Sequence, residues 1–309
     1  METIIQNIQR LQETKEAIKQ ALTNRGVSVS NSDTFYSYAE KIAAISSEKV
    51  NLNILDNIGN PVTEATVDIY YWDDKVESFT STGATLTIYI PQYVYYTIKI
   101  TYTKYKYEDI SYTAINGNTR DINLSVFGVF ICDNTGVLTT VNTWNTDNNS
   151  KSVGAAIIDD NYSFIIGKTN NNSIQWGGYG RDISELTNIE DGDQAKLDFN
   201  GKSNTDKIIS LFGSLDSAAT LCRSKTIRIN GQTREGYLPA LGELNIAYNN
   251  KSQITSALSK IGGTAMLDNY YWSSTEYSKN FAWALHWNYG SVFTHEKGNG
   301  GYCCPWFEY

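Results

Sequence analysis

The sequence predicts a multidomain protein with a short N-terminal α-helical segment, an all-β sandwich and a C-terminal α+β domain. Residues 1–47 carry apolar side chains at helical spacing, residues 48–126 alternate apolar and polar side chains as strands do, and residues 127–309 combine both patterns. With 309 residues, the chain is long enough for two or three domains, each with its own core.

Composition limits the partners and the chemistry to expect. The net charge is −8, the isoelectric point is about 4.9 and no basic run occurs, so we do not expect nucleic acid or an anionic membrane surface as a partner. No segment has the apolar length needed to span a bilayer, and the N-terminus lacks the apolar stretch of a secretory signal. We therefore expect neither membrane insertion nor export by the usual secretory route. The irregular spacing of Cys132, Cys222, Cys303 and Cys304 favours reduced thiols over a disulfide framework.

The first segment, residues 1–47, has the pattern of two helices. The apolar side chains of the first helix follow a heptad spacing, interrupted by Lys15: Ile4, Ile8, Leu11, Ile18 and Leu22. Gly26 is expected to end this helix, and Ser32 or Asp33 to cap the next one. The apolar residues of the second helix fall on one face: Phe35, Ala39, Ile42 and Ile45. Both a helical hairpin that packs on its neighbour and a self-associating stalk fit this pattern.

This segment also resembles the N-terminal attachment regions of phage tail and fibre proteins. The resemblance rests on a short pattern after the first helix: Gly26, Val27, Phe35, Tyr38, Ala39, Lys41, Ile42 and Ile45. It implies that the helices attach the chain to other tail proteins.

The second segment, residues 48–126, is rich in predicted strands. Alternating runs occur at 50–56, 65–72, 84–91, 95–102 and 120–126, with a turn at 57–61. As a whole it resembles the Ig-like β-sandwich of the carboxypeptidase-regulatory or PEGA type. The matching landmarks are Gly59-Asn60-Pro61, Ala65-Thr66-Val67, Ile90-Pro91, Tyr96 and Asn123-Leu124. Such modules are usually spacers, so the resemblance implies a spacer here.

The third segment, residues 127–309, contains most of the residues suited to recognition. Its C-terminal region gathers four of the seven tryptophans and both histidines: Trp272, Trp283, Trp287, Trp306, His286 and His295. Aromatic side chains with Ser, Gly and Asn beside them are typical of binding surfaces. Alternation over 282–293 favours a strand, and Asn288-Tyr289-Gly290-Ser291 is suited to a hairpin turn. The sequence therefore predicts a recognition surface here, and no catalytic cleft.

Several ordered motifs make this third segment similar to the C-type-lectin-like domains of bacterial surface proteins and phage fibres. They are DFNGKSNT at 198–205, which leads into helical patterns at 206–213 and 217–222, then GYLPALGEL at 236–244, with a helix that includes Ile254, Leu258 and Ile261, and finally YWSSTE at 271–276 and AW at 282–283. The resemblance implies a compact α+β fold with two helices, small antiparallel sheets and a loop-rich ligand face. The tail at 303–309 departs from the family pattern and keeps only Pro305.

Many domains of this kind are targets of diversity-generating retroelements, which copy a template repeat with errors at its adenines. An Asn codon altered in this way still ends in a pyrimidine, so it cannot encode Trp, Lys, Gln, Glu or Met. The resemblance thus implies variable positions at residues that this route can reach: Ala284, His286, Tyr289, Ser291, Phe293, Thr294, His295 and Gly298. Trp287, Glu296 and Lys297 cannot be reached, so they are expected to be fixed by the template or changed in another way.

From these patterns we predict the residues that contact a ligand. Trp272 and Trp283 are expected to pack inward and hold the scaffold, while Phe293 fits either the core or the ligand face. The candidate ligand-binding residues are Tyr277, Lys279, Asn280, Phe281, Ala284, His286, Tyr289, Ser291, Phe293, Thr294, His295, Gly298, Asn299 and Tyr302.

Other chemistry is less well supported by the sequence. Cys303 and Cys304 are adjacent, so in an extended chain their thiols point to opposite faces and cannot easily share a zinc ion. A pair such as His295 with Cys303 lacks a visible third catalytic group. The tripeptides typical of calcium-dependent sugar binding, Glu-Pro-Asn and Trp-Asn-Asp, are absent, and the Gly262-Gly263 pair is expected to end a helix. We therefore expect no cofactor, no metal and no enzymatic activity.

The functional expectation is a phage or prophage receptor-binding protein at a tail or fibre tip. Its partners would be a host-cell surface protein or glycan, other virion tail proteins through the N-terminal helices, and two further copies in a homotrimer. The first alternative is a bacterial surface adhesin or lectin. The second is an enzyme like the sulfatase-modifying enzymes, which share the lectin-like fold.

Overall fold

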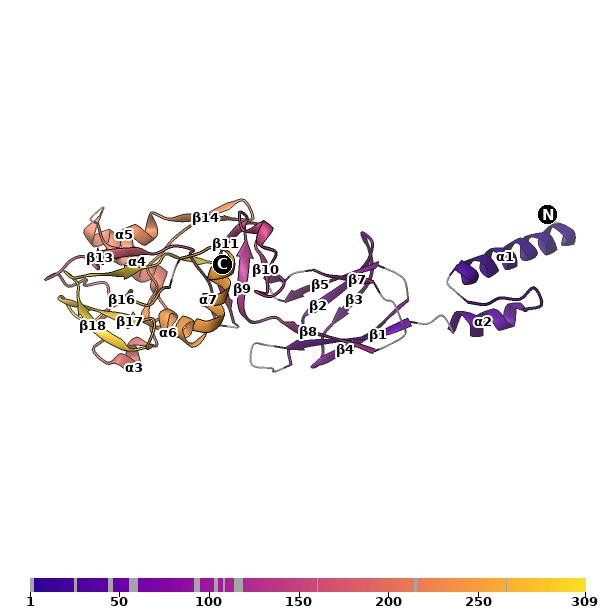
Figure 1. Cartoon of the computed structure of the whole chain (residues 1–309), viewed down its shortest axis with the longest axis horizontal. Helices are drawn as coiled ribbons and strands as arrows, with labels where there is room; N and C mark the ends of the chain where they lie inside the picture. The colour runs from indigo at the N-terminus through magenta and orange to yellow at the C-terminus, as the bar shows by residue number, and fades with distance from the viewer. Residues whose placement is uncertain are drawn as a thin grey trace. The chain divides into compact units, whose positions relative to one another are not determined.

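The structure is a computed structural model of the whole chain. It describes residues 3–24, 27–43, 47–55, 61–91, 95–102, 105–107, 109–113, 119–159, 161–213, 216–264 and 266–309. The chain divides into two compact units (Figure 1). Unit 1 comprises residues 1–54, 61–99 and 109–124, and unit 2 comprises residues 55–60, 100–108 and 125–309. The predicted helical segment and most of the predicted sandwich thus fall in the same unit.

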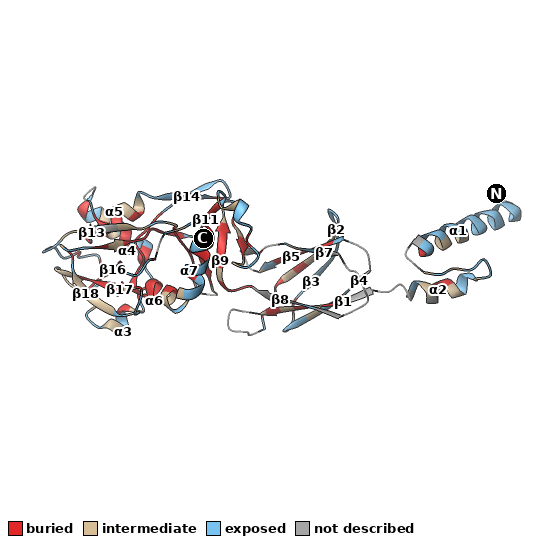
Figure 2. Cartoon of the chain, viewed as in Figure 1, coloured by how far each residue is buried: buried red, intermediate tan, exposed pale blue. Residues whose placement is uncertain are grey.

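Two helices begin unit 1, as the sequence predicts: α1 (Ile4–Asn24) and α2 (Phe35–Ala43). Leu22 near the end of α1 and Tyr38 in α2 are buried. The first half of α1 is exposed (Figure 2), including its large aliphatic side chains: Ile4, Ile5, Ile8 and Leu11. The predicted helix end at Gly26 and the position of Ile45 lie outside the described residues.

The remainder of unit 1 is a β-sandwich, which confirms a mostly-β architecture after the helices. One sheet has the strand order β4-β1-β8, and the other has β5-β2-β3 with β7 also paired with β5. The strands are β1 (Ser47–Leu55), β2 (Thr66–Tyr71), β3 (Asp74–Thr80), β4 (Thr85–Pro91), β5 (Tyr95–Tyr102), β7 (Ile110–Thr113) and β8 (Thr119–Ser125). The alternation in the sequence produces the core, because every second residue points inward: Val50, Leu52 and Ile54 in β1, Val67 and Ile69 in β2, Ile88 and Ile90 in β4, and Tyr96, Ile98 and Ile100 in β5.

Unit 2 contains two larger sheets and a hairpin. The first sheet has the order β20-β12-β11-β9-β10-β6 within this unit, and the second has β13-β19-β16-β17-β18. The strands of the first are β6 (Tyr105–Tyr107), β9 (Gly128–Asp133), β10 (Val137–Thr139), β11 (Ser152–Ile158), β12 (Ser163–Ile166) and β20 (Trp306–Glu308). Those of the second are β13 (Asn171–Gln175), β16 (Tyr270–Glu276), β17 (Phe281–His286), β18 (Val292–Glu296) and β19 (Gly300–Cys303), and the hairpin pairs β14 (Thr226–Ile229) with β15 (Gln232–Glu235).

The helices of unit 2 include those expected from the sequence. They are the 3-10 helix η1 (Thr146–Asn148), α3 (Gly192–Ala195), α4 (Gly201–Phe212), α5 (Ala218–Arg223), α6 (Leu241–Asn249) and α7 (Lys251–Lys260). The helix expected to include Ile254, Leu258 and Ile261 is α7, which contains Ile254 and Leu258 and ends just before Ile261. A separate helix, α6, precedes it, and Asn250 lies between the two. Gly262 (φ +72°) and Gly263 end α7 as predicted, and the amide of Gly263 donates to the carbonyl oxygen of Leu258 at 2.7 Å.

Two apolar cores lie on the two faces of the second sheet. Trp283, Leu285 and Tyr271 pack into one core together with residues of α6, α7, β9, β11 and β12. Trp272 packs into the other with residues of α4 and α5. Trp272 is fully buried and Trp283 is 7% exposed, which confirms that both pack inward. Within the described part of the chain, no helix combines the length and apolarity needed to cross a membrane.

Candidate functional site

The strands β16, β17 and β18 place several predicted ligand-binding residues on one face of the second sheet. The antiparallel register sets Tyr270 opposite His286, Ala284 opposite Phe293 and Ala282 opposite His295. Paired residues in a sheet point to the same side, and alternate residues along one strand do too. His286, Phe293 and His295 therefore share the face on which Trp272 and Ala284 are buried.

We call the accessible part of this surface the aromatic face; its residues are Tyr270, His286, Tyr289, Ser291, Phe293 and His295. The His295 ring lies 4.9 Å from the ring of Tyr270 and 6.0 Å from that of Phe293, measured between centroids. The ring centroids of His286 and Tyr289 are 4.8 Å apart. The aromatic side chains thus form two adjoining groups, joined through the Tyr270–His286 pair.

Exposure on the aromatic face increases toward the turn between β17 and β18. Tyr270, His286, Phe293 and His295 are half-buried, Ser291 is exposed, and Tyr289 is 71% exposed. The predicted hairpin turn forms because Gly290 adopts φ +69°, which L side chains rarely do. The amide of Asn288 donates to Nδ1 of His286 at 3.3 Å, so the turn also fixes this ring. The sequence allowed Phe293 to lie either in the core or on the ligand face. It packs at the edge of the core and remains partly accessible.

Other predicted site residues lie elsewhere, and the prediction for Ala284 is wrong. Ala284 is fully buried under the aromatic face, because β17 is covered on both sides, and cannot contact a ligand. Thr294 is paired with Trp283, so it points to the opposite face of the sheet. Tyr302 also packs on the opposite face, where its ring lies 5.8 Å from that of Tyr271.

The remaining predicted residues gather at the far end of β17. Tyr277, Lys279, Asn280 and Phe281 form or adjoin the connection from β16 to β17, and the ring of Tyr277 packs 5.6 Å from that of Trp283. Gly298 and Asn299 follow β18, and Gly298 lies against the exposed Tyr179. The predicted set is thus divided between the two ends of β17. Tyr277 and Phe281 at the far end are half-buried, with ring centroids 6.3 Å apart, whereas Tyr289 at the turn is exposed.

Tyr270 is a member of the aromatic face that sequence reasoning missed. Its position two residues before Trp272 places it on the same face by alternation, but only the register with His286 shows that it adjoins the predicted residues. Gly301 makes room for it, because a Cβ there would lie 2.9 Å from Cε2 of Tyr270 and 2.6 Å from Nε1 of Trp272. The Tyr270 hydroxyl donates to the carbonyl oxygen of Gly300.

A buried ion pair supports the hairpin that carries the face. Glu276 at the end of β16 accepts from Lys297, which directly follows β18, and both side chains are fully buried. Nζ of Lys297 also donates to the Arg181 carbonyl oxygen at 3.3 Å and lies 4.5 Å from the centroid of the Trp176 ring. Desolvation by burial lowers the pKa of Lys297 and raises the pKa of Glu276. These contacts connect β18 to β16 across β17.

The three family-like motifs meet in a buried polar network below the sheet. Oδ2 of Asp198 accepts from Nδ2 of Asn204 and from Oγ1 of Thr275, each at 2.8 Å. Oγ1 of Thr275 in turn accepts from the amide of Leu241 at 2.9 Å. The motifs at 198–205, 236–244 and 271–276 thus hold the scaffold together.

Glu243 is part of the same network. Its Oε2 accepts from the amide of Ala240 at 2.7 Å, and the hydroxyl of Tyr237 also bonds to it. A Cβ at Gly201 would lie 2.2 Å from Oε2, so only glycine fits there. Desolvation by burial raises the pKa of Glu243 to about 8.

The cysteines lie away from the aromatic face. Cys303 belongs to the core with Trp272 and Cys304 to the core with Trp283, so the two thiols point to opposite faces as their adjacency predicts. Burial raises the pKa of Cys304, which keeps it a neutral thiol. Among the described residues, no group of three or more His, Cys, Asp or Glu side chains is arranged to hold a metal ion.

The chain was compared with family models, with curated proteins and with solved structures. No family model matches it, and no curated protein matches it at a significant level. Among solved structures, a fimbrial protein from Bacteroides ovatus matches with a TM-score of 0.47 and 12% identity, over 85% of this chain and 71% of that one.

Two other solved structures match less well. The Bacillus anthracis TIE protein has a TM-score of 0.23 and 16% identity, over 26% of this chain and 16% of that one. The full-length major pilin RrgB from Streptococcus pneumoniae has a TM-score of 0.18 and 12% identity, over 85% of this chain and 41% of that one. At such TM-scores these matches assign no function, which has to be inferred from the aromatic face.

Proposed function

We propose that this chain is a non-enzymatic recognition protein that binds a host-cell surface protein or glycan through the aromatic face. The observation that carries the proposal is the contrast between this face and its base. The accessible Tyr, His and Phe rings lie on or beside β16, β17 and β18, and the interior residues of β16 and β17 are buried, so the rings are presented by a rigid support. Rings of this kind gain contact area at low conformational cost.

The finer proposal is a C-type-lectin-like domain whose face can be diversified. Burial supports it, because positions unreachable from a mutated Asn codon include the buried Trp287 and Lys297. The reachable positions His286, Tyr289 and Ser291 are accessible instead. Two positions are exceptions: Glu296 is unreachable but exposed, and Ala284 is reachable but buried. Substitutions on the accessible side would leave the ion pair and the core intact.

The proposed setting is a phage tail or fibre tip, with α1 and α2 as the attachment, the sandwich as a spacer and a homotrimer as the assembly. A bacterial cell-surface adhesin is the second candidate, and it uses the aromatic face in the same way. Two of the three proteins with matched structures reported above are named as a fimbrial protein and a major pilin, which is the setting of this second candidate. Detection of the chain in purified virions or on intact bacteria would distinguish the two settings.

The binding proposal is tested by removing the exposed Tyr289 ring together with the adjacent His286 ring. The labelled full-length chain is applied to a panel of bacterial cells and to an array of bacterial surface glycans, with and without EDTA. We expect His286→Ala combined with Tyr289→Ala to weaken binding by about 2 kcal/mol or more, roughly thirtyfold, and EDTA to have no effect. Leu197→Ala removes another exposed apolar side chain (66% exposed) as the control. Unchanged binding by the double variant would refute the proposal.

Diversification is tested at the gene. We expect the sequence encoding the β17–β18 region to have a near-copy nearby, differing at template adenines, beside a gene for a reverse transcriptase. Absence of both from the complete genome would remove the diversification proposal and leave the binding proposal standing.

The proposed absence of catalysis is tested with the cysteines. We expect Cys303→Ser and Cys304→Ser to leave receptor binding unchanged when the variants are folded, because both thiols are buried away from the aromatic face. Turnover of a sulfatase-derived cysteine peptide by the wild-type chain, lost in either variant, would instead support an enzyme.

A further inference from the structure

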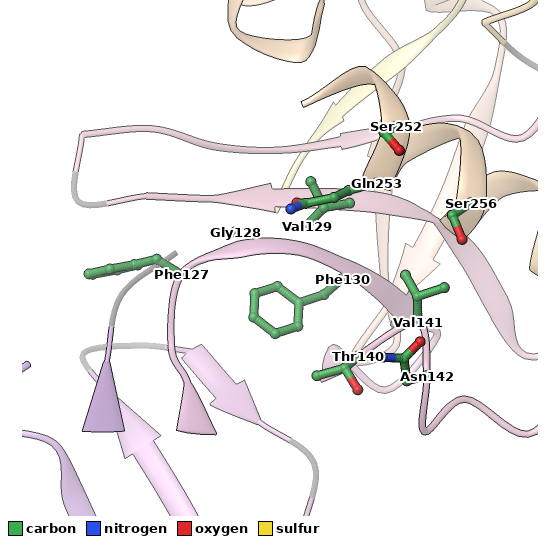
Figure 3. Close-up of a pocket in the computed structure, with 10 residues that line it drawn as sticks. All are labelled: Phe127, Gly128, Val129, Phe130, Thr140, Val141, Asn142, Ser252, Gln253 and Ser256. Carbon is green, nitrogen blue, oxygen red and sulfur yellow. The ribbon is translucent and has the colours of Figure 1, made fainter. Parts of the chain in front are cut away.

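A second concave site lies in unit 2, on elements that do not contribute to the aromatic face. It is a groove of about 390 Å³ between the first turns of α7, the start of β9 and the segment that follows β10 (Figure 3). This volume falls within the roughly 300–1,000 Å³ that is usual for small-ligand sites. The rings of Phe127 and Phe130 and the side chains of Val129 and Val141 form its apolar lining.

The polar side chains that line the groove in the described part of the chain are all uncharged. Ser252, Gln253 and Ser256 of α7 and Asn142 beyond β10 are exposed, and none of these four makes a side-chain hydrogen bond within the described part of the protein. Thr140 adds a further hydroxyl group. Figure 3 shows Ser252, Gln253 and Ser256 along α7, with the side chain of Gln253 extending toward Val129. Hydroxyl and carboxamide groups can each donate and accept hydrogen bonds.

We propose that this groove binds an uncharged saccharide. Among the described residues, no lysine, arginine, histidine, aspartate or glutamate lines it, so a phosphate or carboxylate ligand would lose hydration without a compensating charge. A purely apolar ligand would bury the hydroxyl and carboxamide groups without partners. A neutral sugar satisfies both requirements, because its hydroxyl groups match Ser, Asn and Gln while its C–H face packs on the half-buried side chains of Val129 and Val141.

The site goes beyond the proposed recognition function, because its lining shares no residue with the aromatic face. Binding there could therefore anchor the protein on a glycan while the aromatic face engages another molecule. The two proposals can fail separately, since variants can be placed in one site without touching the other.

The experiment is saturation-transfer difference NMR on the full-length chain with glucose, galactose, mannose, N-acetylglucosamine and lactose. Ser256→Trp fills the groove from an exposed position of α7, and Ser259→Trp places the same bulk at an exposed position of that helix outside the groove. Thermal unfolding of both variants confirms that they are folded. We expect at least one sugar to bind the wild-type chain and Ser259→Trp equally, and Ser256→Trp at least tenfold more weakly.

Two results would overturn the proposal. One is the absence of a signal from every sugar with the wild-type chain. The other is a sugar whose binding survives Ser256→Trp, in particular one that is lost in the His286→Ala, Tyr289→Ala variant and thus belongs to the aromatic face.

Discussion

Glu243 shows how a single buried carboxyl group links the scaffold to pH. Its folded-state pKa is raised from 4.5 to about 8 by desolvation. Between these two values the folded protein retains a proton that the unfolded chain has released. The folded state therefore binds more protons, and its stability falls as pH rises through this window. The stability that the protonated Glu243 contributes to the folded state is fully present below about pH 4.5 and is lost above about pH 8.

The variant Glu243→Gln tests this dependence because it keeps an acceptor for the amide of Ala240 and cannot ionise. We expect the free energy of unfolding of the wild type, relative to the variant, to fall by up to about 1.4 kcal/mol per pH unit between roughly pH 5 and pH 8. Urea unfolding at a series of pH values measures it. A wild-type-minus-variant difference that stays constant with pH would show that Glu243 does not titrate in this range.

Gly290 combines two constraints in the turn that presents Tyr289. It adopts φ +69°, and a Cβ there would lie 2.2 Å from Cε1 of Tyr248. We expect Gly290→Ala to destabilise the protein by more than the roughly 1–2 kcal/mol of left-handed backbone strain alone, and to weaken binding by displacing Tyr289. Gly231→Ala is the matched control, because Gly231 adopts φ +75° in the β14–β15 turn with no atom near its missing Cβ. Equal losses of stability, measured by urea unfolding, would contradict the role given to Tyr248.

At the scale of elements, the hairpin β17–β18 depends on the ion pair between Glu276 and Lys297. Removing one partner leaves the other charge buried and unpaired, which costs about 3–5 kcal/mol. We therefore expect Lys297→Met to destabilise the protein by that amount. Glu276→Leu combined with Lys297→Met should recover much of the loss, because no unpaired charge remains.

Urea unfolding of the wild type, the two single variants and the double variant measures this coupling. Additive losses in the double variant would show that the two side chains act independently. Because the double variant should recover much of the lost stability, we expect it also to bind the same cell panel more strongly than Lys297→Met alone.

Local patterns predicted many elements, and tertiary contacts account for those that they missed. Alternation located β1, β2, β4 and β5, because each of these strands buries one side in the sandwich, and it also located β8. It missed β3, whose sequence DKVESFT is mostly exposed and carries no apolar alternation. Alternation also could not show that Ala284 is buried. Both faces of β17 are covered, so the residues on neither face are exposed to solvent.

The candidate site was predictable only in part for a similar reason. Composition and turn signals identified the β17–β18 hairpin and its accessible rings. The face that each residue occupies depends on register and on neighbouring strands, which far-apart segments supply. The structure therefore adds Tyr270 to the aromatic face and places Thr294 and Tyr302 on the opposite face of the sheet.

At the scale of the whole molecule, the exposed half of α1 bears on how strongly the aromatic face can bind. Weak sites that are linked in one assembly gain affinity through a raised effective concentration, without new contacts. The heptad spacing of α1 provides a seam for such an assembly, and the seam residues Ile4, Ile8 and Leu11 are 79%, 51% and 58% exposed. We expect the full-length chain to self-associate through α1, as a trimer in the proposed assembly.

The variant Ile8→Lys with Leu11→Lys tests this assembly, because it places charges in the seam of every copy. We expect it to be monomeric by analytical ultracentrifugation and to bind cells at least tenfold more weakly than the wild type, with unchanged affinity for a single immobilised receptor copy. Gln9→Lys with Glu13→Lys is the matched control, because both positions lie outside the heptad seam of the same exposed helix. A wild-type chain that is monomeric at the concentrations used for cell binding would show that α1 does not associate with its own copies, and that the affinity of the aromatic face is that of one site.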